Sequence, residues 1–181
     1  MQSTVVGVLL LGVVGMVAGD STRVEFKLYN FTSSGQLHDG QKCDIGTHCD
    51  PRLRGYVDTQ KPDSAWPGPL PLEKWALIYE GLDIIDTARL GKIVSRDVCT
   101  DSYTKANLRV QVDEVDPTRI DKMEQFMCLS GRDVQRSESA ATWSRPAQCD
   151  AHYQPRANKL LYSWRAFTIP ARECGKTGAR A

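Results

Sequence analysis

The chain has 181 residues, with 23 Lys or Arg against 22 Asp or Glu, so its net charge is +1. This length predicts one domain, or one domain with a small appendage. The charge balance leaves no excess that would drive binding to nucleic acid or to an anionic membrane by field alone. An apolar content of 41% together with the low net charge argues against disorder of the whole chain.

The first residues predict export. Residues 1–19 carry no charged side chain, and their apolar centre, Val5 to Val17, is too short to span a bilayer comfortably. Small residues at Ala18 and Gly19 precede a polar stretch, as at the cleavage site of a secretory signal peptide. A membrane anchor or a buried helix is the alternative. We expect residues 1–19 to be removed and the mature protein to be secreted.

The cysteines are expected to form disulfides, because an exported chain folds in an oxidising space. The six are Cys43, Cys49, Cys99, Cys128, Cys149 and Cys174. None belongs to a Cys-x-x-Cys pair and the histidines lack ligand spacing, so we expect no zinc site. Cys43 and Cys49 bracket a short loop that a local disulfide would close.

The opening segment of the mature chain predicts a strand with one buried face. Val24, Phe26 and Leu28 alternate with polar or amphipathic residues, which is the period of a half-buried strand. The sequence Asn30-Phe31-Thr32 is a sequon and predicts glycosylation of Asn30 if that side chain is exposed.

Later segments extend this pattern. Further strand candidates are 53–57, 75–82, 92–98 and 108–112. Residues 83–91 suit a loop or a helical turn, and 123–129 are apolar but ambiguous between strand and helix. The proline-rich stretch 61–71 and the polar stretch 130–146 are predicted loops. Several short strands separated by turns predict an all-β sandwich.

Three segments together resemble the Notch ligands of the Delta/Serrate/Jagged type. The first is the opening strand with its Cys loop, from Val24 to Pro51. The second is Trp66-Pro67-Gly68 followed by the apolar run 75–82. The third joins Cys149-Asp150-Ala151-His152-Tyr153 with Cys174-Gly175-Lys176-Thr177-Gly178, and is similar to the cysteine-rich Delta/Serrate/LAG (DSL) domain.

The resemblance implies a fold and a division of the chain. Residues 20–146 would form the Notch-ligand N-terminal (MNNL) module, a C2-like antiparallel β-sandwich. Residues 147–181 would form a partial DSL domain, a small irregular disulfide-linked segment. Full-length relatives carry epidermal-growth-factor (EGF) repeats and a single membrane-spanning segment, and neither is recognised in this sequence.

The resemblance also implies a disulfide pattern. The second and third cysteines of a DSL domain would fall near Asn158 and Tyr162, and neither is Cys. Their partners Cys149 and Cys174 are therefore expected to pair with each other. Cys99 and Cys128 then remain as a pair by elimination.

The first function implied by the resemblance is binding to EGF repeats of a Notch-type receptor. The residues expected to contact the receptor are Asp150, His152, Tyr153, Arg165, Phe167 and Ile169. The alternative is that Trp164, Phe167 and Ile169 pack beneath the loop. A soluble chain cannot pull on a receptor, so we expect it to modulate cell-cell signalling rather than to activate the receptor.

The second function is binding of phospholipid or glycan by loops at one end of the sandwich, without a receptor role. Asp58, Asp63, Asp83 and Asp86 would supply oxygen ligands if Ca²⁺ takes part. Trp66 would insert at a membrane interface. Plain loop carboxylates and a core-packed Trp66 are the alternatives.

Catalysis is not expected, and no cofactor other than Ca²⁺ is considered. The best nucleophile would be a free Cys149 near His152 with Asp150 as orienter, but a disulfide at Cys149 would remove it. We interpret Asp113, Glu114 and Asp116 as carboxylates on solvated turns. The sequence has no Gly-rich phosphate loop.

Overall fold

The computed structural model describes residues 21–176, so the predicted signal peptide at 1–19 lies outside the described residues. The strands are β1 (Ser21–Thr32), β2 (Pro51–Asp58), β3 (Ala76–Glu80), β4 (Thr87–Val98), β5 (Asn107–Val115), β6 (Ile120–Leu129), β7 (Ala147–Gln148), β8 (Asp150–Ala151) and β9 (Lys159–Ile169). Two 3-10 turns, η1 (Leu72–Lys74) and η2 (Ala171–Glu173), accompany them. Within 21–176, no helix has the length and apolar character needed to cross a bilayer.

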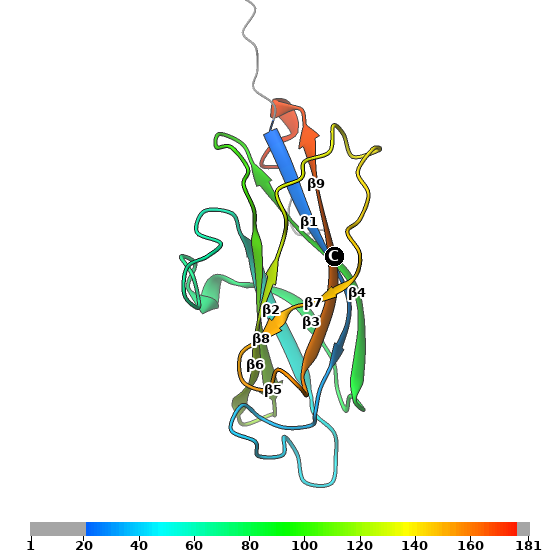
Figure 1. The fold of residues 1–181 in the computed structure, drawn as a ribbon. Helices are drawn as coiled ribbons and strands as arrows, with labels where there is room; N and C mark the ends of the chain where they lie inside the picture. The colour runs from blue at the N-terminus through cyan, green and yellow to red at the C-terminus, as the bar shows by residue number, and fades with distance from the viewer. Residues whose placement is uncertain (1–20, 177–181) are drawn as a thin grey trace, which may run out of the picture.

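Two antiparallel sheets pack face to face (Figure 1). One sheet has the strand order β4-β1-β9-β7 and the other the order β3-β2-β5-β6-β8. The predicted all-β sandwich is confirmed. The ambiguous run at 123–129 belongs to strand β6. Of the segment 83–91, residues 83–86 form a loop as expected, whereas 87–91 already belong to strand β4, so the prediction of a loop or helical turn is wrong for them.

The core lies between the sheets and follows the alternation of the sequence. Val24, Phe26 and Leu28 of β1 are fully buried, as are three alternating aliphatic residues of β5. Phe31 of β1 meets Phe126 of β6 across the interface, with ring centroids 6.0 Å apart at 79°. Each such side chain contributes about 1.5–3 kcal/mol by leaving water, so this layer supplies much of the driving force for folding.

A β-bulge changes the face that β1 buries. The register of β1 against β4 shifts between Leu28 and Asn30, where β4 carries Gly91 at φ +60°. The shift brings Phe31 inward. Asn30 remains half-buried on a central strand, opposite Arg89 on one side and Leu161 on the other.

Residues assigned by resemblance to a separate partial domain contribute to both sheets. The eleven residues of β9 pair with β1 along their length and lie between β1 and β7. β8 adds to the edge of the other sheet beside β6. The buried side chains of residues 147–169 therefore pack in the core of the sandwich and not in a core of their own. Only η2 and the residues next to it form an irregular, disulfide-linked C-terminal segment.

The local disulfide Cys43–Cys49 is confirmed. The predicted pairs Cys149–Cys174 and Cys99–Cys128 are wrong, because Cys99 is bonded to Cys174 and Cys128 to Cys149. No cysteine within 21–176 is free.

Strand register explains the two corrected pairs. Thr22 pairs with Val98 on one side and with Thr168 on the other, so the end of β4 and the end of β9 lie one strand apart. Cys99 and Cys174 follow those ends. On the other sheet Met127 pairs with Asp150, which brings the adjacent Cys128 and Cys149 to a Cα–Cα distance of 4.4 Å.

Candidate functional site

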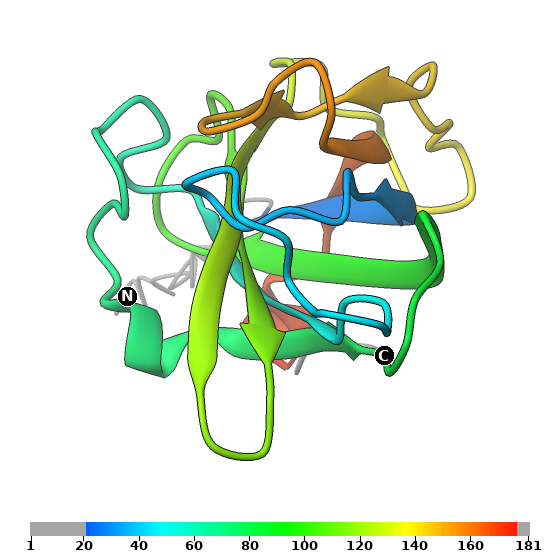
Figure 2. The same ribbon diagram turned by 90° about the horizontal axis from the view of Figure 1, so that it is seen from below.

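Four connections meet at one end of the sandwich. They are the segments 33–50, 81–86, 116–119 and 152–158, which we call the loop end. Figure 2 looks onto this end, and the long blue to cyan segment between β1 and β2 crosses it. The longest connection at the loop end, 33–50, carries a disulfide of its own.

The Cys43–Cys49 disulfide holds the tip of this connection in a tight loop. Gly46 within it has φ +94°, a conformation that side chains other than glycine rarely adopt. The N–H of Ile84 donates to the carbonyl of Cys49 at 2.9 Å, which ties the tip to the 81–86 connection. Ile45 at the tip is fully exposed.

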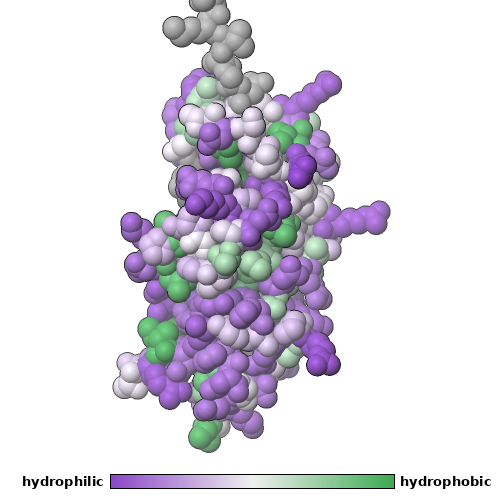
Figure 3. Space-filling model, turned by 60° about the vertical axis from the view of Figure 1, so that its left-hand side comes forward, coloured by the Kyte–Doolittle hydropathy of each residue, from purple (hydrophilic) through white to green (hydrophobic). Residues whose placement is uncertain are grey.

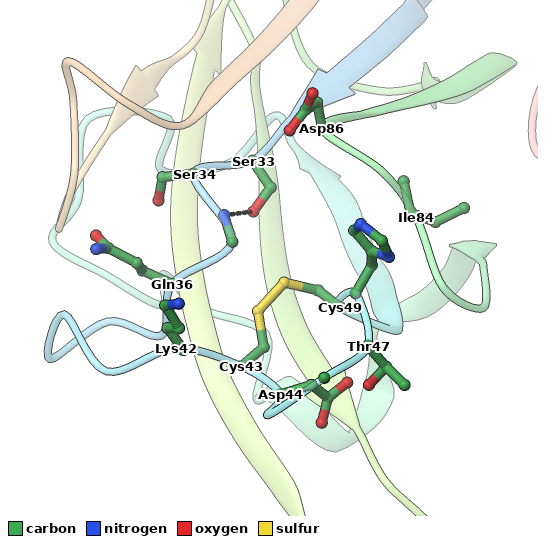
Figure 4. A pocket seen from close by; sticks show the side chains of 13 residues that line it. Ser33, Ser34, Gln36, Lys42, Cys43, Asp44, Thr47, Cys49, Ile84 and Asp86 are labelled. Atoms are coloured by element: carbon green, nitrogen blue, oxygen red, sulfur yellow. Dashed lines mark hydrogen bonds between the residues drawn. A yellow bond between two sulfur atoms is a disulfide. The ribbon is translucent and has the colours of Figure 1, made fainter.

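A cavity of about 270 Å³ opens between these two connections. Its polar lining includes hydroxyl groups, one ammonium, one imidazole and two carboxylates, from Ser33, Ser34, Thr47, Lys42, His48, Asp44 and Asp86 (Figure 4). The disulfide forms part of its wall. The Ser33 hydroxyl accepts the N–H of Gly35 at 3.0 Å. The mixture of donors and acceptors suits a charged or zwitterionic polar group.

An acidic cluster lies beside the cavity. Carboxylate oxygens of Asp44, Glu114 and Asp116 lie within 4.8 Å of one another. Glu114 at the end of β5 is fully buried, and both of its oxygens accept the N–H of Asp50 at 2.9 Å. Burial raises the pKa of Glu114 to about 7, and the negative charges of Asp44, Asp50 and Asp116 act in the same direction. Clustered carboxylate oxygens are the ligands that hard divalent cations prefer.

Exposed aliphatic side chains lie on the same end of the sandwich as this cluster. Leu82 and Ile85 on the 81–86 connection are 75% and 64% exposed, and Ile120 at the start of β6 is 59% exposed. With Ile45 they form a set that we call the apolar tips. In Figure 3, isolated green side chains stand among purple ones at the lower end of the molecule.

The aspartates predicted as calcium ligands do not converge. Asp58 is buried at the opposite end, where the guanidinium of Arg109 donates to its carboxylate at 3.1 Å and 3.2 Å. Asp63 is exposed and pairs with Lys105. Both are far from the loop end because β2 runs away from it: Asp58 is the last residue of β2, and Asp63 lies in the connection that follows.

Asp83 and Asp86 do lie at the loop end, and both have positive φ, at 51° and 56°. The Asp83 carboxylate accepts the N–H of His48 at 3.1 Å and its own N–H donates to Asp50 at 2.6 Å, so it braces two connections together. Asp86 lines the cavity.

Sequence reasoning did not bring Asp44, Glu114 and Asp116 together. They come from two separate connections and the end of a strand, so only the topology makes them neighbours. The available signal was the group of acidic residues Asp113, Glu114 and Asp116, directly after the predicted strand 108–112.

The residues expected to contact a receptor divide into two groups. Asp150, His152 and Tyr153 lie at or near the surface. Phe167 and Ile169 are buried in β9, and the Arg165 side chain is 15% exposed. Arg165 pairs with Glu25 at 2.7 Å and lies over the rings of Trp143 and Phe167. Arg165, Phe167 and Ile169 therefore belong to a strand and not to the expected loop. The burial of Phe167 and Ile169 agrees with the alternative that these two side chains pack inside the protein.

Trp66 does not belong to any of the four connections of the loop end. It is half-buried on the proline-rich connection, with its ring centroid 5.0 Å from that of Trp75. This position agrees with a packed Trp66 better than with a membrane-inserted one.

Comparison with known proteins identifies the fold. No protein-family profile matches the sequence, and no curated protein matches it. The structure is similar to that of a C2 domain protein from Ramazzottius varieornatus, with a TM-score of 0.80, 25% identity, and coverage of 87% of this chain and 95% of that one. The chain has a C2-like fold.

A second similarity is to human GIVD cytosolic phospholipase A2, with a TM-score of 0.51 and 12% identity. It covers 84% of this chain but only 17% of the phospholipase, so it concerns the fold of one portion of that enzyme. Neither of these two proteins is a Notch ligand, and the resemblance to Notch ligands stays a prediction.

Proposed function

We propose that the loop end binds a phospholipid membrane surface, and that a divalent cation such as Ca²⁺ couples it to anionic headgroups. The observation that carries the proposal is that apolar tips on separate connections share one end of the sandwich with an acidic cluster. A membrane surface offers an apolar layer beneath charged headgroups, and this end of the sandwich offers the complementary groups in the same arrangement. The C2-like fold supports the choice of surface, since phospholipid-binding C2 domains use the loops at one end.

Insertion of the apolar tips contributes favourably to the free energy of membrane binding. Ile45 is fully exposed, and transferring such a side chain from water to an apolar layer contributes about 1.5–3 kcal/mol. The Cys43–Cys49 disulfide fixes the loop before binding, so little conformational entropy is lost when the tip inserts. Leu82 and Ile85 on the adjoining connection would add to the same contact.

The acidic cluster makes the contact depend on a cation. Without one, Asp44, Glu114 and Asp116 would meet the negative potential of an anionic leaflet and repel it. Ca²⁺ takes about six to eight oxygen ligands. The three carboxylates would hold the ion from the protein side, and lipid phosphate and water would complete its coordination.

The cavity beside the cluster would receive the headgroup. Lys42 and the hydroxyl of Thr47 line it, and neither side chain has an ion pair or hydrogen bond with any residue of 21–176. They are therefore available as donors to phosphate oxygens. Asp86, which lies across the cavity from Lys42 and Thr47 in Figure 4, would attract a headgroup ammonium.

Co-sedimentation with vesicles of phosphatidylserine and phosphatidylcholine tests the proposal. The protein should pellet with vesicles in Ca²⁺ and stay in the supernatant in EDTA. Ile45→Asp should abolish pelleting. Val134→Asp, which alters an exposed aliphatic residue near the opposite end, should leave it unchanged. Equal pelleting of both variants, or no pelleting in Ca²⁺, would overturn the proposal.

The remaining expectations from the sequence stay predictions. These are receptor binding, the absence of catalysis, secretion, and glycosylation of Asn30. Capture of the protein by receptor EGF repeats, with no pelleting on vesicles, would favour the receptor role over the lipid role.

A further inference from the structure

A second cavity, of about 150 Å³, lies on the outer face of the β3-β2-β5-β6-β8 sheet, away from the loop-end cavity. Its lining is Trp66, Gln125, Met127, Asp150, Ala151 and His152. It joins the proline-rich connection to strands β6 and β8, which are distant in sequence. Its volume equals about five water molecules at the volume each occupies in the liquid, which suits one small ring.

The aromatic wall of this cavity is held in place from behind. Trp66 contacts Trp75, and Trp75 contacts Tyr56, each at a centroid distance of 5.0 Å. Buried Arg109 fastens the connection that carries Trp66, because its guanidinium donates to the carbonyl of Ser64 at 2.8 Å. Trp66 is therefore positioned before any ligand arrives, which lowers the entropy cost of binding.

Two polar side chains of the cavity are available to a ligand, whereas the amide of Gln125 already donates to Gln111 at 3.3 Å. The carboxylate of Asp150 makes no hydrogen bond or ion pair with any residue of 21–176, although it lines the cavity. The exposed imidazole of His152 lies two residues further along, with its ring against Tyr153 at 4.6 Å. Met127 is partly exposed on the strand opposite Asp150.

We propose that this cavity binds a single pyranose ring of a glycan. A pyranose presents a C–H face that packs on Trp66 and Met127. Its hydroxyl groups both donate and accept hydrogen bonds, which matches the acceptor oxygens of Asp150 and the donor and acceptor nitrogens of His152. A ligand cation would use the carboxylate and the indole but would gain nothing from the imidazole N–H. The function is separate from lipid binding at the loop end.

Saturation-transfer NMR with methyl glycosides of glucose, galactose, mannose and N-acetylglucosamine tests this site. At least one glycoside should bind with a dissociation constant of about 1 mM, as expected for one small ring, and its ring C–H protons should receive the most saturation. Asp150→Asn keeps the shape but removes the charge, and it should weaken binding by about tenfold. Trp66→Ala should abolish binding.

The matched control is Asp133→Asn, an exposed aspartate on a different cavity that Trp164 and Arg165 also line. It should leave glycoside binding unchanged, and so should Ile45→Asp, which separates this site from the loop end. If Trp66→Ala fails to fold, Asp150→Asn decides the matter. Binding of tetramethylammonium without any glycoside, no glycoside binding, or equal binding by Asp150→Asn and the parent protein would overturn the proposal.

Discussion

The side-chain amide of Asn158 donates a hydrogen bond of 3.1 Å to the carboxylate of Glu124, and both residues are buried. The same carboxylate accepts the backbone N–H groups of His152, Tyr153 and Gln154 at 2.8–3.0 Å. One buried glutamate on β6 thus organises the connection between β8 and β9. It holds in place the segment around Asn158, the position near which a DSL domain would carry its second cysteine.

Replacing Glu124 with Gln should destabilise the protein by about 2–4 kcal/mol. The amide loses the charge that strengthens these bonds, and its NH₂ group faces donors where the carboxylate offered an acceptor. Urea unfolding measures the loss, and faster hydrogen exchange at the amides of 152–154 would locate it. Glu80→Gln, at an exposed pair with Arg52, is the control and should cost less than about 1 kcal/mol. Unchanged exchange at 152–154 would contradict the role of Glu124.

The stability of the protein should fall as the pH rises from about 4.5 to 7. Glu114 has its pKa raised from 4.5 to about 7 in the folded state, first by burial and then by neighbouring carboxylates. In this window the folded state binds more protons than the unfolded state, so each step up in pH favours unfolding. The loss is at most about 3 kcal/mol, and it is complete above pH 7.

Glu114→Gln isolates this effect, because Asp113, whose pKa burial also raises, is unchanged in the variant. Between pH 5 and pH 8 the parent protein should lose unfolding free energy that the variant keeps, so the variant should become more stable relative to the parent. Ca²⁺ should restore part of the parent's stability at pH 8 and have less effect on the variant. A constant difference across this range would show that Glu114 titrates at its ordinary value.

The buried ion pair between Asp58 and Arg109 should be costly to break. Asp58→Asn leaves the guanidinium charge without a counter-ion inside the protein, and we expect a loss of about 3–5 kcal/mol. Asp63 lies in the connection after β2 and forms an exposed pair with Lys105. Asp63→Asn removes the charge of this pair and should cost less than about 1 kcal/mol. Thermal or urea unfolding of the two variants checks this, and similar losses would contradict it.

Non-reducing peptide mapping should recover three linked pairs, Cys43–Cys49, Cys99–Cys174 and Cys128–Cys149. Replacing both Cys128 and Cys149 with Ser should destabilise the protein by about 2–4 kcal/mol, because the cross-link limits the unfolded chain. Recovery of a Cys149–Cys174 peptide would contradict the strand register described above.

Several strands could be predicted because their pattern is local. The alternation of Val24, Phe26 and Leu28 indicates the buried face of β1, and the aliphatic residues of β5 do the same. The β-bulge near Tyr29 could not be predicted, because it depends on how β1 pairs with its two neighbours: β4 has an extra residue there, and Tyr29 is itself the extra residue against β9. The inward position of Phe31 follows from these two shifts in register.

β9 shows a different difficulty. Leu160, Tyr162 and Ala166 are buried and fall on one face of the strand, so the pattern was present in the sequence. Comparison with the expected cysteine positions at Asn158 and Tyr162 favoured a loop instead. Cys99 and Cys174 are 75 residues apart, and their pairing depends on the order of three strands, which no local pattern contains.

The sequence predicts the type of residue at the loop end but not which residues meet there. The sequence indicates acidic loops on an all-β fold, but the partners of each acid depend on the direction of its strand. Asp58 and Asp63 follow β2 to the opposite end, whereas Glu114 follows β5 to the loop end. The alternating directions of the strands therefore separate acids that look equivalent in the sequence.

Fluorescence of a tryptophan placed at Ile45, measured on vesicles with brominated lipids and Ca²⁺, tests the central claim most directly. Because Ile45 is fully exposed, Ile45→Trp should fold normally, and bromine in the acyl chains should quench the added fluorescence. Val134→Trp should show no additional quenching. Equal quenching of both variants, or quenching at Val134 alone, would contradict insertion of the loop end.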